Sequence, residues 1–227
     1  MLALKLIAGV VSNVVLFGIM LFLPAGTFDW GRAWIFLGVV FIATSATMFG
    51  IFRGNEALLD ERYSLPIQEG QPVADRIVLV LFIVTFAGAI VFIPLDVFRF
   101  HLLAKPGVIV STLGLILFCA GWLLISLAFR ENTFAAPVVK HQAERRQTVI
   151  DSGVYSVVRH PMYSSAVLML IGISLWLESY AAALFSVIPI ALLAVRIIFE
   201  ERFLRRALDG YDAYVERVRY RLIPFLW

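Results

Sequence analysis

The chain has 227 residues, of which 61% are hydrophobic and 15% are charged, with a mean hydropathy of +0.91. A soluble globular domain is about half apolar and about one quarter charged, so this composition excludes an ordinary soluble protein. The net charge of +3 does not require nucleic acid, because membrane proteins concentrate Lys and Arg in their cytoplasmic loops. We expect a single membrane domain that has membrane lipids, and no nucleic acid, as partners.

Apolar runs recur along the chain, and several reach the roughly 18–20 residues that cross a bilayer. Because backbone N–H and C=O groups cannot stay unpaired in lipid, such runs must be helices. The sequence therefore predicts an all-α integral membrane protein with about six transmembrane helices. The expected spans are Ala3–Leu23, Ala33–Phe52, Ile77–Leu95, Val108–Phe129, Met162–Leu177 and Tyr180–Phe199.

The last two expected spans are separated only by Glu178–Tyr180, so we expect them to form a tight antiparallel hairpin. The start of the first hairpin helix should then lie beside the end of the second. Most of the 19 basic residues fall in loops that this topology places on one side. The positive-inside rule puts that side, with both termini, in the cytoplasm, and the compact chain suits a bacterial inner membrane.

The segment RHPMY, residues 159–163, places polar groups at the start of the hairpin. Pro161 suits the first turn of a helix, where its missing N–H costs nothing, and it biases His160 away from the helical conformation. The segment therefore predicts a sharp helix entry. Arg159 and His160 should lie near the helix N-terminus, with Tyr163 one turn inside.

Ionisable residues also lie at the end of the hairpin, in the segment RIIFEERFL, residues 196–204. Arg196 and Glu200 are four residues apart and share one face of a helix. Charged groups near lipid cost free energy, so they normally face a protein cavity and have partners. The hairpin would gather both segments into one site. A cofactor could reach this site from the cytoplasm and a lipid-like substrate from the bilayer.

Three segments, GVYSVVRHPMYSS, RIIFEERFL and YDAYVERVRYRLIP, together resemble the C-terminal signature of the isoprenylcysteine carboxyl methyltransferase family. The related phospholipid methyltransferases share its outline. The resemblance runs from about Asn132 to Pro224. Two positions depart from it, since Val154 stands where the family often has proline and Ser165 where it often has glycine. Both replacements are small and leave the substrate open.

The resemblance implies an integral-membrane methyltransferase that uses S-adenosylmethionine. Residues 1–107 would supply N-terminal transmembrane helices, and residues 108–227 the methyltransferase core with its cofactor-binding loop and a cytoplasmic amphipathic C-terminal helix. Arg196 would hold the reacting carboxylate of an isoprenylcysteine-type, lipid-like acceptor, and Glu200 and His160 are the other catalytic candidates. The implied cofactor-binding residues are His141, Gln142, Tyr155, Arg159, His160, Tyr163, Glu200, Glu201, Tyr211 and Tyr214.

The acceptor stays open between three chemical classes. Direct displacement on a sulfonium needs no covalent enzyme intermediate, so the protein mainly supplies position and field. A carboxylate acceptor is deprotonated at neutral pH and can be oriented by an arginine. An amine acceptor, as in phospholipid N-methylation, or a thiol acceptor needs a general base, for which His160 is the candidate.

Each site residue also has a purely structural interpretation. Arg159 and Arg196 could be snorkelling anchors at the membrane surface. Glu200 and Glu201 could form i,i+4 ion pairs with Arg196 and Arg205, and the chain would then be a membrane scaffold without activity. A transporter is disfavoured because the spans are apolar through their middles. The three histidines are scattered without ligand spacing, so we expect no metal site.

Overall fold

The computed structural model describes residues 2–63, 71, 73–135, 138 and 145–227, and over these residues it contains helices, turns and loops but no strand. This confirms the predicted all-α fold. Within that part of the chain, five segments are long and apolar enough to cross a membrane. They are Leu2–Ala25, Gly31–Gly54, Val73–Phe100, Val108–Glu131 and Tyr180–Ala207.

The fifth expected span is the apolar helix α6 (Pro161–Trp176), which has 16 residues. At 1.5 Å per residue it is about 24 Å long, less than the roughly 30 Å of a bilayer's hydrocarbon core. The other long helices are α1 (Leu2–Ala25), α2 (Gly31–Gly50), α4 (Val73–Leu95), α5 (Val108–Glu131) and α8 (Val187–Ala207). Shorter elements connect or follow them: η1 (Phe52–Gly54), α3 (Glu56–Arg62), η2 (Asp96–Phe100), η4 (Gly153–Ser156), α7 (Tyr180–Phe185) and α9 (Tyr211–Arg217).

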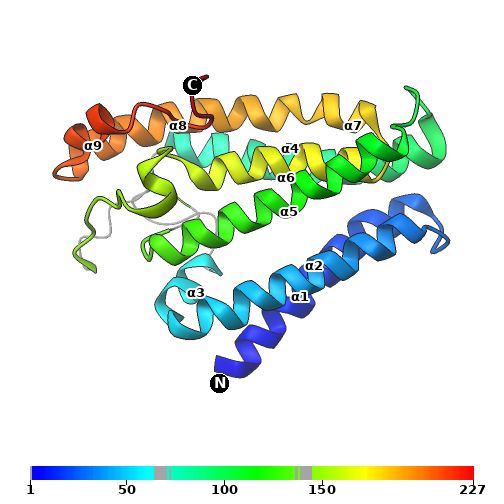
Figure 1. Cartoon of the computed structure of the whole chain (residues 1–227), viewed down its shortest axis with the longest axis horizontal. Coiled ribbons are helices and arrows are strands. Elements are labelled where there is room, and N and C mark those ends of the chain that lie inside the picture. Colours follow the sequence, from blue (N-terminus) through cyan, green and yellow to red (C-terminus); the bar gives the residue numbers. More distant parts are fainter. Residues whose placement is uncertain (1, 64–70, 72, 136–137, 139–144) are drawn as a thin grey trace.

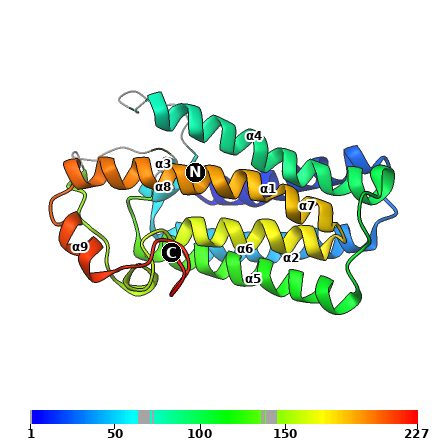
Figure 2. The ribbon, with the colours of Figure 1, turned by 90° about the horizontal axis from the view of Figure 1, so that it is seen from above.

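The long helices lie side by side, with α5 against α6, α8 along α4, and α1 in contact with both α2 and α4 (Figure 1). Helix α9 follows the end of α8, at the opposite end of the bundle from α7 (Figure 2). It has seven residues, and Tyr211 and Tyr214 on one side of it are buried. The C-terminal helix is therefore short, and its buried side faces the end of the bundle.

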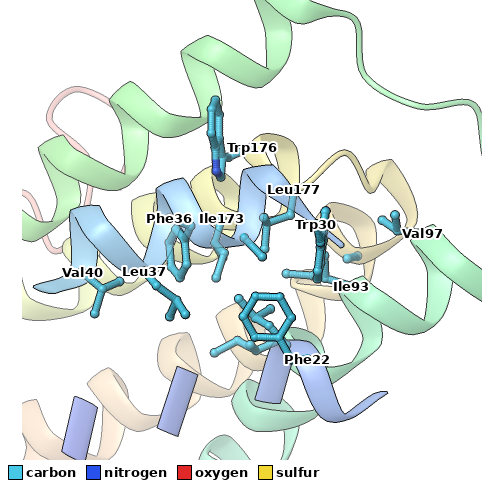
Figure 3. Packing of buried hydrophobic residues seen from close by; sticks show 14 of the residues in the cluster. Phe22, Trp30, Phe36, Leu37, Val40, Ile93, Val97, Ile173, Trp176 and Leu177 are labelled. Atoms are coloured by element: carbon cyan, nitrogen blue, oxygen red, sulfur yellow. The ribbon is translucent and has the colours of Figure 1, made fainter. Parts of the chain in front are cut away.

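An apolar core joins the N-terminal helices to the C-terminal ones. Phe22 of α1, Phe36 of α2 and Ile93 of α4 meet Ile173 of α6 in this core (Figure 3). The ring of Phe36 also contacts that of Phe118 on α5, with the ring centroids 4.8 Å apart. Because these side chains are almost fully buried, the first half of the chain fixes the position of the hairpin that carries the polar groups.

Small residues bring α5 and α6 into very close contact. A Cβ atom added to Gly172 would lie 2.5 Å from the backbone nitrogen of Phe118, and one added to Gly121 would lie 2.9 Å from the carbonyl oxygen of Ser165. Small residues allow such an approach between helices in membranes. Ser165 itself is fully buried, which explains why only a small side chain stands there.

Replacement of Gly172 by alanine should lower the thermal unfolding temperature in detergent, because the added methyl group must displace the backbone of α5. Overpacking of this kind costs about 1–3 kcal/mol. Gly88→Ala is the matched control, since a Cβ atom there meets nothing within 4 Å and alanine favours a helix. Equal unfolding temperatures for the two variants would contradict the tight contact between α5 and α6.

Candidate active site

The helix entry at the start of α6 is fixed by the chain that follows α9. Pro161 is the first residue of α6, and His160 before it is non-helical, with φ −124° and ψ 60°, as the sequence predicts. The backbone N–H groups of Arg159 and His160 donate to the carbonyl oxygens of Tyr220 and Arg221, each at 2.9 Å. The turn is therefore held by two backbone hydrogen bonds to a segment about 60 residues later in the chain.

Glu201 is the centre of a buried ion cluster. Its Oε1 accepts a hydrogen bond from Arg159 Nε at 2.7 Å and lies 3.2 Å from His160 Nε2. Its Oε2 accepts from Arg221 Nε at 3.1 Å. The side chains of Arg159 and Glu201 are 3% and 5% exposed. This burial excludes the interpretation of Arg159 as a snorkelling anchor. Arg205, the alternative partner considered for Glu201, pairs instead with Asp212.

Tyr163 connects the two helices of the hairpin one turn further along α6. Its hydroxyl group donates to Glu200 Oε2 at 2.5 Å, and its ring stacks on that of His160 with a centroid distance of 5.5 Å. The guanidinium of Arg196 lies over the same ring, 5.8 Å from its centroid. The start of α6 thus lies beside the end of α8, as the predicted hairpin requires.

Arg196 forms a buried ion pair that the sequence analysis did not identify. Its Nε donates to Asp75 Oδ1 at 3.0 Å, and the two side chains are 6% and 1% exposed. Gln71 Nε2 donates to the other oxygen of Asp75 at 2.7 Å. Arg196 is therefore no snorkelling anchor either. The sequence feature that could have indicated this ion pair is Asp75 itself, an acidic residue directly before a long apolar run.

A pocket with about 800 Å³ of empty space, counting its open mouth, lies beside these groups. The predicted residues that line it are Tyr155, Arg159, His160, Tyr163, Glu200, Tyr211 and Tyr214. Residues that were not predicted also line it, among them Asn132, Phe134, Gln147, Thr148, Leu204 and Leu208. Arg196 and Glu201 belong to the networks behind the lining. His141 and Gln142 lie outside the residues that the structure describes.

Three tyrosines from η4 and α9 line the pocket. Tyr214 donates its hydroxyl hydrogen bond to the carbonyl oxygen of Tyr155 at 2.8 Å, and the Tyr155 hydroxyl accepts one from Asn132 at 3.1 Å. Burial raises the pKa of all three phenols, and the nearby Glu200 carboxylate raises the pKa of Tyr155 and Tyr211 further. These hydroxyl groups therefore stay neutral at physiological pH.

The backbone before Tyr155 requires a glycine. Gly153 has a φ of +54°, and a Cβ atom there would lie 2.7 Å from Cδ of Glu131 at the end of α5. Both features exclude a larger residue. Ser152 Oγ also donates to Glu131 Oε2 at 2.8 Å. This turn ties η4 to α5 and so places Tyr155 at the pocket beside Asn132.

Replacement of Glu201 by glutamine should destabilise the protein strongly, because Arg159 and Arg221 would lose their buried counter-charge. Removing one partner of a buried ion pair costs about 3–5 kcal/mol. The unfolding temperature in detergent measures the effect, and Glu216→Gln at an exposed position of α9 is the control. If both variants unfold at the wild-type temperature, charge pairing does not hold the cluster together.

Comparison with known proteins gives one family match. The model of the phospholipid methyltransferase family matches residues 109–209, a little less than half of the chain. The matched region begins in α5 and includes the start of α6 and the end of α8, but it stops before α9. A search of curated proteins finds no match. The chain is thus similar to a family of membrane methyltransferases, while its resemblance to the isoprenylcysteine carboxyl methyltransferases stays a prediction.

Proposed function

We propose that the protein is a membrane-embedded methyltransferase that binds S-adenosylmethionine in the pocket and methylates a lipid-like acceptor. The observation that carries this proposal is the place of Glu200. Its carboxylate lines the pocket, among the rings of several tyrosines, and accepts a hydrogen bond from Tyr163. The family match to membrane methyltransferases supports the same activity.

The lining of the pocket suits the chemical groups of this cofactor. Glu200 offers a negative charge to the cationic ammonium and sulfonium groups, and the faces of Tyr155, Tyr211 and Tyr214 also attract cations. Asn132 and its polar neighbours offer hydrogen bonds to an adenine or a ribose. When bound, the cofactor would supply a methyl group activated by its sulfonium.

The chain's own residues would then supply position and field. The ion cluster of Glu201 fixes the positions of Arg159 and His160. The ring of Tyr163 stacks on His160, and its hydroxyl group holds the carboxylate of Glu200. Arg196 lies over the ring of Tyr163 without lining the pocket. We therefore place the cofactor on the Glu200 side of Tyr163 and the acceptor on its Arg196 side. Groups that are held in fixed positions speed the reaction because they keep the reacting atoms aligned.

Two acceptor classes compete for the Arg196 side. The sequence resemblance assigns Arg196 to an acceptor carboxylate, but Asp75 already matches its charge. An acceptor carboxylate would have to share Arg196 with Asp75, whose like charge would repel it. The ion pair therefore favours an amine acceptor of the phospholipid type as a second candidate beside the isoprenylcysteine type. An amine must lose its proton before it attacks, and His160, whose ring stacks on that of Tyr163, is the candidate base.

We further propose that the pocket opens to the cytoplasm of a bacterial cell. Exposed basic residues surround this end of the bundle, among them Arg205, Arg206, Arg217 and Arg219, as the positive-inside rule expects of a cytoplasmic face. Residues 108–227, which contribute the described pocket lining, would be the methyltransferase core, and residues 1–107 would support it.

Binding of S-adenosylmethionine to the detergent-purified protein tests the cofactor site. Glu200→Gln should weaken binding roughly 10- to 100-fold, as expected for loss of a hydrogen bond to a charged group worth about 1.5–3 kcal/mol. Titration calorimetry gives the dissociation constants, and Glu216→Gln is the control for a lost carboxylate outside the pocket. Absence of binding to folded wild-type protein would overturn the proposed function.

Transfer of a tritiated methyl group tests the acceptor. The protein in vesicles would receive labelled S-adenosylmethionine with either phosphatidylethanolamine or an S-farnesylcysteine analogue. Base-stable label in the phospholipid would identify an amine acceptor, since methylamines survive alkali. Base-labile label in the farnesylcysteine would identify a methyl ester and hence a carboxylate acceptor. Transfer to neither compound would contradict a lipid-like acceptor of these two classes.

A further inference from the structure

A chain of contacts links α4 to the pocket through three side chains. Asp75 on the first turn of α4 holds Arg196 of α8 at 3.0 Å. Arg196 lies over the ring of Tyr163, whose hydroxyl group donates to Glu200 in the pocket lining. A displacement of Asp75 would therefore move Arg196, and with it the group that lies over the ring of Tyr163 on the acceptor side.

We propose that Asp75 is a positioning residue for methyl transfer, which holds the guanidinium of Arg196 against Tyr163 on the acceptor side. This inference rests on the proposed function. Both oxygens of Asp75 have fixed partners, Arg196 Nε at 3.0 Å and Gln71 Nε2 at 2.7 Å. The carboxylate therefore has one orientation, and the guanidinium is held between it and the ring of Tyr163, 5.8 Å from the ring centroid.

The surroundings of this ion pair make it a strong constraint. Asp75 and Arg196 are almost fully buried, and charges attract each other more strongly there than in water. Arg196 has a long side chain that could reach several places along α8, including Glu200 one turn later. Asp75 selects one of these positions, the one over Tyr163. The residue that fixes the acceptor side thus comes from α4, outside the region that the family model matches.

Asp75→Asn tests this role, because it keeps the shape of the side chain and removes its charge. The methyl-transfer assay with phosphatidylethanolamine and the S-farnesylcysteine analogue gives kcat and KM for the acceptor. We expect transfer to fall on the order of 10²-fold, as small misplacements can cause. The dissociation constant of S-adenosylmethionine should change much less, because Tyr163 can still donate its hydrogen bond to Glu200 and neither Asp75 nor Arg196 lines the pocket.

Two further variants separate positioning from stability. Glu178→Gln removes the carboxylate of another ion pair, with Arg32 at 3.1 Å, far from the pocket, and should retain transfer. The exchange of Asp75→Arg with Arg196→Asp restores a pair but moves the guanidinium to α4. It should recover the unfolding temperature without recovering transfer. Asp75→Glu, which keeps the charge, should recover part of the transfer.

Several results would overturn the inference. These are full transfer by Asp75→Asn, full transfer by the exchanged pair, or a loss of cofactor binding by Asp75→Asn that matches its loss of transfer. The last result would mean that Asp75 only stabilises the fold. Failure of the proposed function looks different, because wild-type protein would then bind no S-adenosylmethionine or transfer no methyl group, and the inference would fall with it.

Discussion

The burial of charge beside an apolar bundle is the constraint on which the site depends. A buried charge is costly unless it is paired and hydrogen-bonded, and Glu201 meets this requirement with Arg159, His160 and Arg221. These partners come from the start of α6 and from the chain after α9. The cluster is complete only when both segments reach the end of α8. The positions of His160 and Tyr163, and through them of Glu200, follow from that closure.

Local signals in the sequence predicted much of this arrangement. Apolar runs predicted the helices because lipid leaves the backbone no other partner, and Pro161 predicted the entry into α6. The short connection at Glu178–Tyr180 correctly brought the two hairpin ends together. The same signals could not divide the roles of Glu200 and Glu201. Adjacent residues on a helix point about 100° apart, and the partners of Glu201 at the start of α6 and after α9 leave Glu200 to face the pocket.

Contacts between distant parts of the chain account for what the sequence did not predict. Asp75 and Arg196 are 121 residues apart, whereas Glu200 is the nearer and more obvious partner at one helical turn. A partner at such a distance leaves no periodic pattern, so only the packing of α8 along α4 reveals it. The close approach at Gly172 also leaves no pattern in the sequence, because it depends on how far α5 is shifted along α6.

The hydrogen bonds around Arg159 also bear on how the protein is made. Arg159 Nη1 donates to the carbonyl oxygen of Val218, 59 residues later in the chain. At a synthesis rate of about 5–20 residues per second, this partner leaves the ribosome roughly 3–12 s after the arginine. Glu201 also follows Arg159, by 42 residues. The hydrogen bonds that fix the N-terminal end of α6 can therefore form only after α8 and the segment that follows α9 have been synthesised.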